Sequence, residues 1–145
     1  MIERTLVIVK PEHLRIGSQI LQDLDPYGWR EQTVFLESVD ADVAALHCLP
    51  HAGRDYHPRL LRQFSSRAVI LGVYSGENVI TLLDHAVGPT DPQIAPPDTI
   101  RGKYSVDTLA RAIEEDRALQ NVVHCSRTPQ EAKQDLQVWE RYLNF

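Results

Sequence analysis

The sequence has few cysteines, no long apolar run and no excess of basic residues. Its two cysteines, Cys48 and Cys125, are too few for a disulfide framework, so we expect a reducing, cytoplasmic location. The apolar run nearest the N-terminus covers only residues 6–9, far less than a signal peptide or a membrane span requires. We therefore expect neither export nor membrane association. With 20 acidic against 15 basic residues the formal net charge is -5, which opposes general binding to nucleic acid.

The chain has enough apolar residues for one packed core. Its 145 residues are 43% hydrophobic, which suits a single domain over residues 1–145. Aliphatic runs predict strands at residues 5–9 and 68–74, and a looser alternation predicts another at 29–39. Helical spacing predicts helices within residues 16–24, 40–49, 58–64, 79–87 and 105–119, and after Thr128-Pro129.

Residues 88–103 hold four prolines and two glycines, so they predict a long structured loop. A short strand at residues 121–124 follows the helix-prone segment. The order of elements predicts an α+β fold of the ferredoxin-like split βαβ kind, an antiparallel sheet with helices packed around it. A fold of this kind says little about function by itself.

His124 is the residue with the most chemical interest. A strand that buries Val123 turns His124 to the opposite face, and Ser126 follows where the chain turns. A nucleophilic histidine needs a neutral ring, with one nitrogen facing the substrate and the other donating to a fixed acceptor. Asp135, on the predicted last helix, is a candidate acceptor. Attack on a phosphoryl group also needs cations and N–H donors around its oxygens, and Lys10, Thr90 and Arg101 are suitable types.

Four motifs together resemble those of nucleoside diphosphate kinases. They occur in the family's order and cover almost the whole chain: Val9-Lys10-Pro11, Gly88-Pro89-Thr90-Asp91-Pro92, Thr99-Ile100-Arg101-Gly102 and Asn121-Val122-Val123-His124-Cys125-Ser126. The resemblance implies a ping-pong enzyme that transfers the γ-phosphate of ATP to nucleoside diphosphates through a phosphohistidine at His124. It also implies Mg²⁺ held mainly by the nucleotide phosphates, and a symmetric homo-oligomer.

The resemblance also implies a role for each matching residue. Asp135 takes the place of a glutamate that supports the histidine, and Ser126 is the serine beside it. Lys10 and Asn121 contact the ribose hydroxyl, with Lys10 also near the terminal phosphate. The remaining nucleotide contacts come from Thr90 and Arg101, which hold the phosphates, and from Tyr56, which stacks on the base. Stacking needs only a ring face, so we expect weak base selectivity.

Some positions depart from the family pattern. Asp84 stands where the family has a phosphate-binding arginine, and it repels phosphate. Cys48 stands where a tyrosine approaches the histidine, and Cys125 and Arg127 replace a glycine and an aspartate. The stretch between Arg101 and Asn121 is roughly ten residues longer than usual, an insertion that a surface connection tolerates. We hypothesise that Arg111, Arg117 or Arg127 compensates for Asp84.

Three other interpretations compete with a kinase. A catalytically impaired nucleotide-binding or assembly module would explain Asp84 and Cys48, and a small-ligand regulatory domain could share the fold. His47, Cys48 and His51 are metal-ligand types, but Pro50 and Gly53 interrupt a continuous helix, so we do not predict a zinc site. Phosphohistidine formation separates the kinase from the first two.

Overall fold

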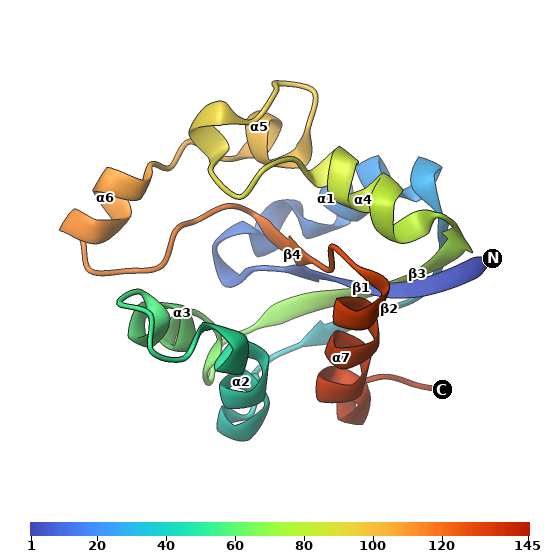
Figure 1. Ribbon diagram of the computed structural model, residues 1–145, viewed down its shortest axis with the longest axis horizontal. Coiled ribbons are helices and arrows are strands. Elements are labelled where there is room, and N and C mark those ends of the chain that lie inside the picture. The colour runs from blue at the N-terminus through green and yellow to red at the C-terminus, as the bar shows by residue number, and fades with distance from the viewer.

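A computed structural model describes all 145 residues (Figure 1). The strands and α-helices are, in order, β1 (Ile2–Val9), α1 (Gly17–Leu24), β2 (Trp29–Leu36), α2 (Ala41–Cys48), α3 (His57–Phe64), β3 (Val69–Glu77), α4 (Val79–Val87), α5 (Ile100–Tyr104), α6 (Leu109–Glu114), β4 (Val123–Cys125) and α7 (Pro129–Trp139). Short 3-10 turns lie at Pro11–Ile16, Asp25–Tyr27, Leu49–His51, Pro92–Ile94 and Glu140–Tyr142. None of the helices is long and apolar enough to cross a membrane.

The four strands form one sheet in the order β2-β3-β1-β4, and each neighbouring pair is antiparallel. The two central strands, β1 and β3, are the ones whose sequences form nearly continuous apolar runs. The edge strand β2 has only exposed and half-buried residues, as expected for a strand with one neighbour. This order is that of the split βαβ arrangement, so the predicted ferredoxin-like α+β fold is confirmed.

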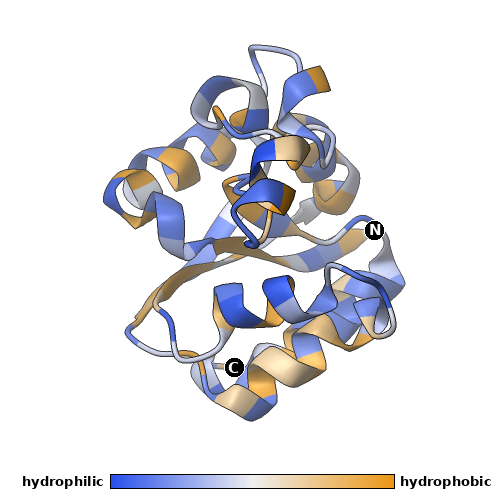
Figure 2. Ribbon diagram, turned by 90° about the vertical axis from the view of Figure 1, so that its left-hand side faces the viewer, coloured by the Kyte–Doolittle hydropathy of each residue, from blue (hydrophilic) through white to orange (hydrophobic).

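Two hydrophobic clusters lie on opposite faces of the sheet, because successive side chains of a strand alternate in direction. Val7 and Val9 belong to the cluster that α1 and α4 cover, whereas Leu6 and Ile8 belong to the one that α2, α3 and Trp139 of α7 cover. Figure 2 shows helices above and below the sheet, with the apolar strand residues between them. Full burial of each such side chain contributes about 1.5–3 kcal/mol.

The proline-rich loop is partly helical. Its first part makes the turn Pro92–Ile94, and α5 begins at Ile100 with Thr99 as a cap, whose hydroxyl accepts from the Gly102 N–H at 3.1 Å. Gly102 is required there, because a Cβ at this position would collide with the carbonyl oxygen of Pro96. The loop is thus a structured segment, as the sequence predicts, and it ends in the helix that carries Arg101.

The helix predicted over residues 105–119 is only partly correct, because α6 covers just Leu109–Glu114. The rest of the segment is extended or turned, and Asp107 holds it in shape. The carboxylate accepts two hydrogen bonds from the Arg117 guanidinium, at 2.8 and 2.9 Å, and a third from the Gln120 N–H at 2.9 Å. A bidentate pair of this kind favours a closed loop over a longer helix.

Candidate functional site

His124 faces the side of the sheet that α2, α3 and α7 cover. It pairs directly with Ile8 of β1, and side chains at paired positions lie on the same face. Before the strand, the Val123 N–H donates to the Asn121 carbonyl, which closes a γ-turn around Val122 at φ 77. A β-branched residue rarely adopts this conformation, which costs about 1–3 kcal/mol and is typical of functional sites. The turn sets the direction in which His124 leaves the sheet.

The His124 ring is held by α7. Its Nε2 lies 2.8 Å from Oδ2 of Asp135, and the Ser126 hydroxyl donates to the same oxygen at 2.7 Å. Burial raises the pKa of the Asp135 carboxyl, but the hydrogen bond from His124, its ring charge and the bond from Ser126 outweigh burial and leave the pKa below its usual value. An ionised carboxylate keeps the proton of a neutral imidazole on Nε2. Nδ1 then retains its lone pair, and the ring lines a cavity.

His47 of α2 packs against His124, with 4.5 Å between ring centroids in an edge-on arrangement. The Trp139 indole N–H donates to His47 Nδ1 at 3.1 Å. Burial, reinforced by His124, lowers the pKa of His47 well below its usual value, so this ring is neutral at pH 7. The sequence reasoning missed this role. Its signal was the helical spacing from Val43 and Ala44, both fully buried, to His47.

Cys48, which the resemblance placed beside the histidine, does not reach the cavity. It is fully buried in the hydrophobic cluster under the sheet, where burial raises the pKa of the thiol to about 11. The neighbour of His124 is therefore His47, one residue earlier. At the position where the family has a tyrosine, Cys48 is therefore a core residue, and the contact with the His124 ring comes from residue 47.

His47, His124 and Asp135 are the only group of three metal-ligating side chains in the structure that lie close enough together to hold an ion. Ligand atoms of His47, His124 and Asp135 lie within 4.8 Å of one another. The atoms that face one another already have partners, because His47 Nδ1 accepts from Trp139 and His124 Nε2 is hydrogen-bonded to Asp135. The cluster is best described as a hydrogen-bonded support for the His124 ring.

Lys10 and Asn121 join β1 to the proline-rich loop. Lys10 Nζ donates to Asn121 Oδ1 at 2.7 Å, and Asn121 Nδ2 donates to the Thr90 carbonyl at 3.0 Å. Burial, followed by the charge of Arg101, lowers the pKa of Lys10 to about 7. Three predicted residues, far apart in sequence, thus meet at one place. Because a buried cation is costly when alone, Lys10 is suited to receive an anion.

Arg101 lies at the same place but is largely occupied. Its guanidinium donates to three backbone carbonyls, those of Gly88 at 2.9 Å, Asn121 at 3.0 Å and Val123 at 2.8 Å. An arginine has five N–H donors, so two remain for a ligand. The side chain therefore fixes the loop and β4 relative to each other while it lines the cavity.

Arg127, on the turn after β4, reaches across the loop. Its Nη2 donates to Thr90 Oγ1, and its Nε lies 3.7 Å from Oδ1 of Asp84 on α4. Arg117, one of the three arginines considered as compensation for Asp84, is instead ion-paired with Asp107 at 2.8 Å and with Glu115 at 3.0 Å. Arg127 is the one that contacts Asp84.

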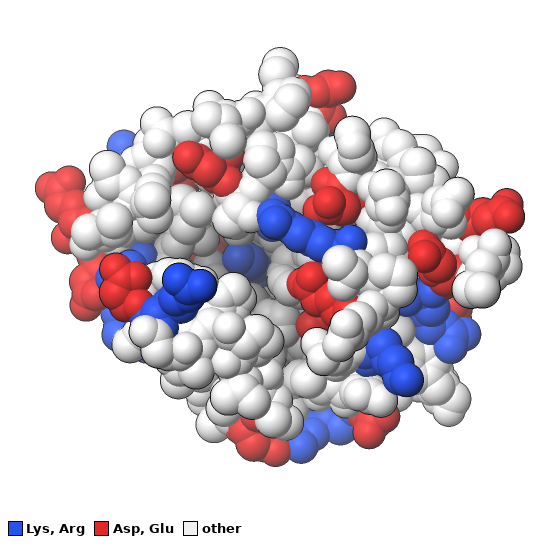
Figure 3. Space-filling view, viewed as in Figure 1, with Lys and Arg blue, Asp and Glu red and all other residues white.

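Six of the predicted residues line a cavity of about 630 Å³. Lys10, Thr90, Arg101, Asn121 and His124 line one part of it. Tyr56 lines it too, with its hydroxyl 2.6 Å from His51 Nδ1, and α6 contributes an apolar wall. Figure 3 shows the hollow on this face, with basic side chains at its rim and floor. Ser126 and Asp135 lie behind His124 and do not line the cavity.

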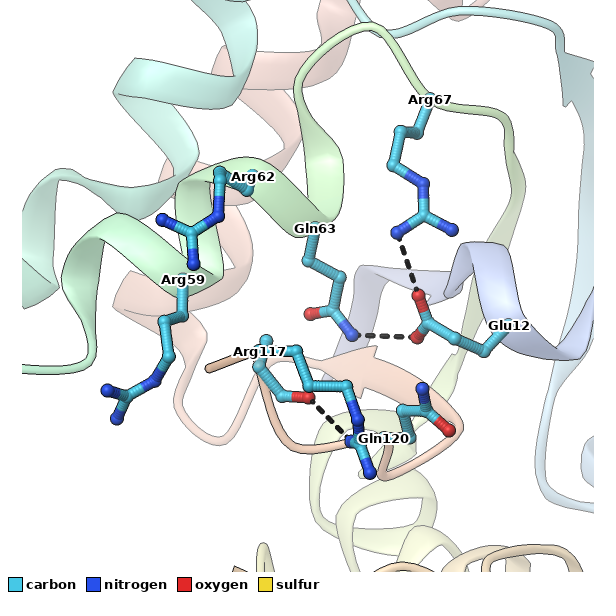
Figure 4. A pocket seen from close by; sticks show the side chains of 8 residues that line it. Glu12, Arg59, Arg62, Gln63, Arg67, Arg117 and Gln120 are labelled. Carbon is cyan, nitrogen blue, oxygen red and sulfur yellow. Dashed lines mark hydrogen bonds and ion pairs between the residues drawn. The ribbon is translucent and has the colours of Figure 1, made fainter. Parts of the chain in front are cut away.

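A smaller hollow of about 240 Å³ adjoins the first and is rich in arginine (Figure 4). Glu12 lies inside it, accepting from Gln63 at 2.8 Å and from Arg67 at 3.2 Å. Arg62 is ion-paired with Asp116 at 3.3 Å, and Arg117 is paired with Asp107. Because most of these arginines are already neutralised, the larger cavity is the better candidate for an anionic substrate.

Comparisons with known proteins agree on one family. The model of the family described as "Nucleoside diphosphate kinase" matches residues 3–142. Among curated proteins, the chain is similar to a nucleoside diphosphate kinase of Thermomicrobium roseum, with 35% identity over 96% of this chain and 88% of that protein. It is also similar to the enzyme of a Streptococcus agalactiae serotype V strain, with 30% identity over 94% and 97%.

Solved structures give the same result for the fold. The nucleoside-diphosphate kinase of Borrelia burgdorferi, described as a transition-state mimic with bound vanadate and ADP, matches with a TM-score of 0.82 and 25% identity, over 99% of this chain and 92% of that one. An NDP kinase of Pyrobaculum aerophilum also gives a TM-score of 0.82 and 25% identity, over 99% and 100%.

Proposed function

Because the chain belongs to the nucleoside diphosphate kinase family, we propose that it transfers the γ-phosphoryl group of ATP to nucleoside diphosphates through a phosphohistidine at His124. One observation carries the proposal. The His124 Nε2–Asp135 hydrogen bond leaves Nδ1 as the free nitrogen of a ring that lines a cavity with Lys10 and Arg101. A nucleophile held in one tautomer beside cations is what phosphoryl transfer requires.

In the first half-reaction, the Nδ1 lone pair of His124 attacks the γ-phosphorus of ATP. The N–P bond forms, the bond to the bridging oxygen breaks, and that oxygen leaves with ADP. The ring becomes cationic while its Nε2 proton stays against Asp135, whose carboxylate stabilises the charge. In the second half-reaction, a terminal phosphate oxygen of a nucleoside diphosphate attacks the phosphohistidine. The N–P bond then breaks, and the lone pair returns to Nδ1.

Lys10, Thr90 and Arg101 receive the phosphates in this proposal. Lys10 Nζ has two N–H donors beyond its bond to Asn121, and Arg101 has two beyond its three carbonyls. The Thr90 hydroxyl accepts from Arg127, so its own proton is available to a phosphate oxygen. Lys10 and Asn121 are also placed to contact a ribose hydroxyl, and Tyr56 offers a ring face to the base.

Bound together with the nucleotide, Mg²⁺ would neutralise charge across the phosphates. The chain itself offers the metal little at this end of the cavity. The Asp84 carboxylate faces Arg127, and Asp135 is bound to His124 and Ser126. Glu131, which lines the cavity, accepts from the Arg127 backbone N–H at 3.2 Å. This donor set fits a metal held mainly by the phosphate oxygens of the substrate.

We further propose that residues 1–145 act as one kinase domain in the cytoplasm, assembled as a homo-oligomer. Support for assembly comes from the edge strand β2, where Trp29 and Phe35 are 74% and 64% exposed. Large exposed aromatics on an unpaired edge favour contact with another copy. Sedimentation equilibrium would test this, and a monomer at micromolar concentration would contradict it.

The competing function is a nucleotide-binding or assembly module without turnover, which Asp84 favours. Incubation with γ-labelled ATP and Mg²⁺, followed by a GDP chase, decides between the two. The kinase gives an acid-labile phosphoprotein whose label passes to GTP, and His124→Gln gives none. His85→Gln, at an exposed position on α4, is the matched control and keeps the label. A wild-type protein that binds ATP but takes no label is the impaired module.

A further inference from the structure

At the end of the cavity lined by Lys10, Thr90, Arg101 and Arg127, one cation keeps most of its N–H donors free of hydrogen bonds to the protein. Lys10 is bound to Asn121, and Arg101 is held by three carbonyls and is 6% exposed. By contrast, the Arg127 side chain is 52% exposed and makes one side-chain hydrogen bond, to Thr90. Its guanidinium therefore keeps four N–H donors for a ligand or solvent.

The surroundings of Arg127 hold it over the cavity. The Thr90 hydroxyl accepts from Nη2 on one side, and Asp84 lies 3.7 Å from Nε on the other. β4 ends at Cys125, two residues before Arg127, and Thr128 caps the following helix by accepting from the Glu131 N–H at 3.1 Å. The backbone that carries Arg127 is thus fixed at both ends.

The simpler explanation is an ordinary surface ion pair. An exposed pair at this distance contributes little to stability, so folding alone gives weak reason for Arg127 to reach across to α4 and the loop. The explanation also leaves unexplained why the guanidinium lines the same cavity as His124, Lys10 and Thr90.

We propose that Arg127 binds the phosphates of the nucleotide, and that Asp84 and Thr90 are positioning residues that aim its guanidinium. The inference rests on the proposed function, because it assigns one more residue to the same cavity. Asp84, which stands where the family has a phosphate-binding arginine, would by itself repel phosphate. In this arrangement its carboxylate faces Arg127, which neutralises its charge. A guanidinium fork held from behind is suited to bidentate contact with phosphate oxygens.

The main test measures binding of MgADP by calorimetry to wild type, Arg127→Ala and Arg127→Lys. Arg111→Ala is the control, because this exposed arginine of α6 lies outside the cavity lining. We expect Arg127→Ala to weaken binding roughly 10- to 150-fold, the usual loss for a charge-assisted hydrogen bond. The MgADP affinity of Arg127→Lys should lie between those of wild type and Arg127→Ala, and the affinity of Arg111→Ala should equal that of wild type. Equal binding by Arg127→Ala and Arg111→Ala would overturn the inference.

A second test separates positioning from repulsion by Asp84. Asp84→Asn is measured with Arg127 present and with Arg127→Ala. If Asp84 positions Arg127, the substitution tightens MgADP binding only in the Arg127→Ala background, where the carboxylate has lost its partner. Equal tightening in both backgrounds would show a merely repelling charge and overturn the role of Asp84.

The outcomes also separate this inference from the proposed function. If wild type binds MgADP through Arg127 but forms no phosphohistidine, the inference stands and the kinase proposal is wrong. If wild type forms phosphohistidine while Arg127→Ala binds MgADP as tightly as wild type, the kinase proposal stands and the inference about Arg127 is wrong. A wild-type protein that binds no nucleotide overturns both. Melting temperatures of all variants should agree closely, because a purely structural defect would lower them together with binding.

Discussion

Replacing Asp135 by alanine tests the core of the proposed mechanism. The carboxylate accepts hydrogen bonds from His124 at 2.8 Å and Ser126 at 2.7 Å, both at Oδ2. Only the bond from His124 strengthens as the ring becomes cationic during transfer. A hydrogen bond to a charged group contributes about 1.5–3 kcal/mol, which corresponds to a rate change of about 10- to 150-fold. We expect the rate of His124 phosphorylation to fall by that factor.

The assay is a single-turnover quench-flow measurement with γ-labelled ATP, normalised to folded protein. Gln134→Ala, at an exposed position of the same helix, is the control and should keep the wild-type rate. Ser126→Ala should slow the step less, about 2- to 10-fold, because a bond between Ser126 and Asp135 acts on the ring only indirectly. If Asp135→Ala phosphorylates as fast as Gln134→Ala, then the carboxylate does not stabilise the charged ring, and the reasoning fails.

Three further predictions concern neighbouring groups. Lys10 has a folded pKa of about 7, below its unfolded value, so the unfolded chain binds more protons above pH 7 and stability should rise with pH. In urea unfolding, the free energy of unfolding should rise by up to about 1.4 kcal/mol per pH unit between pH 7 and 9. Lys10→Met should not show this rise. The pKa of His47 is also lowered in the fold, so its contribution to stability is lost as pH falls below about 6.5; His47→Phe should flatten that acid limb. Tyr56→Phe, which removes only the hydroxyl bonded to His51, should leave the KM values unchanged, whereas Tyr56→Ala should raise them about 5- to 100-fold, similarly for purine and pyrimidine diphosphates. A loss confined to one base would contradict stacking by Tyr56.

Local sequence patterns predicted most elements, because their signals lie within a few residues. The helix expected over residues 79–87 is α4, Val79–Val87, whose apolar face repeats with the helical period. Thr128-Pro129 starts α7 as expected, since the hydroxyl cap and the proline both act on the first turn. The strand expected at 121–124 is shorter and later, at Val123–Cys125, because the γ-turn around Val122 occupies its start. Nothing local favours a positive φ at a valine.

The sequence by itself determined the order of strands and helices, the structured loop and the motif around His124, since each depends on local propensity, apolar period or a recognisable string of residues. Only the tertiary structure decided that His47 and not Cys48 meets the His124 ring, that Arg101 is tied to three carbonyls, and that Arg127 faces Asp84. These contacts join residues from different elements. Their geometry follows from how the helices pack on the sheet, and no spacing along the chain encodes it.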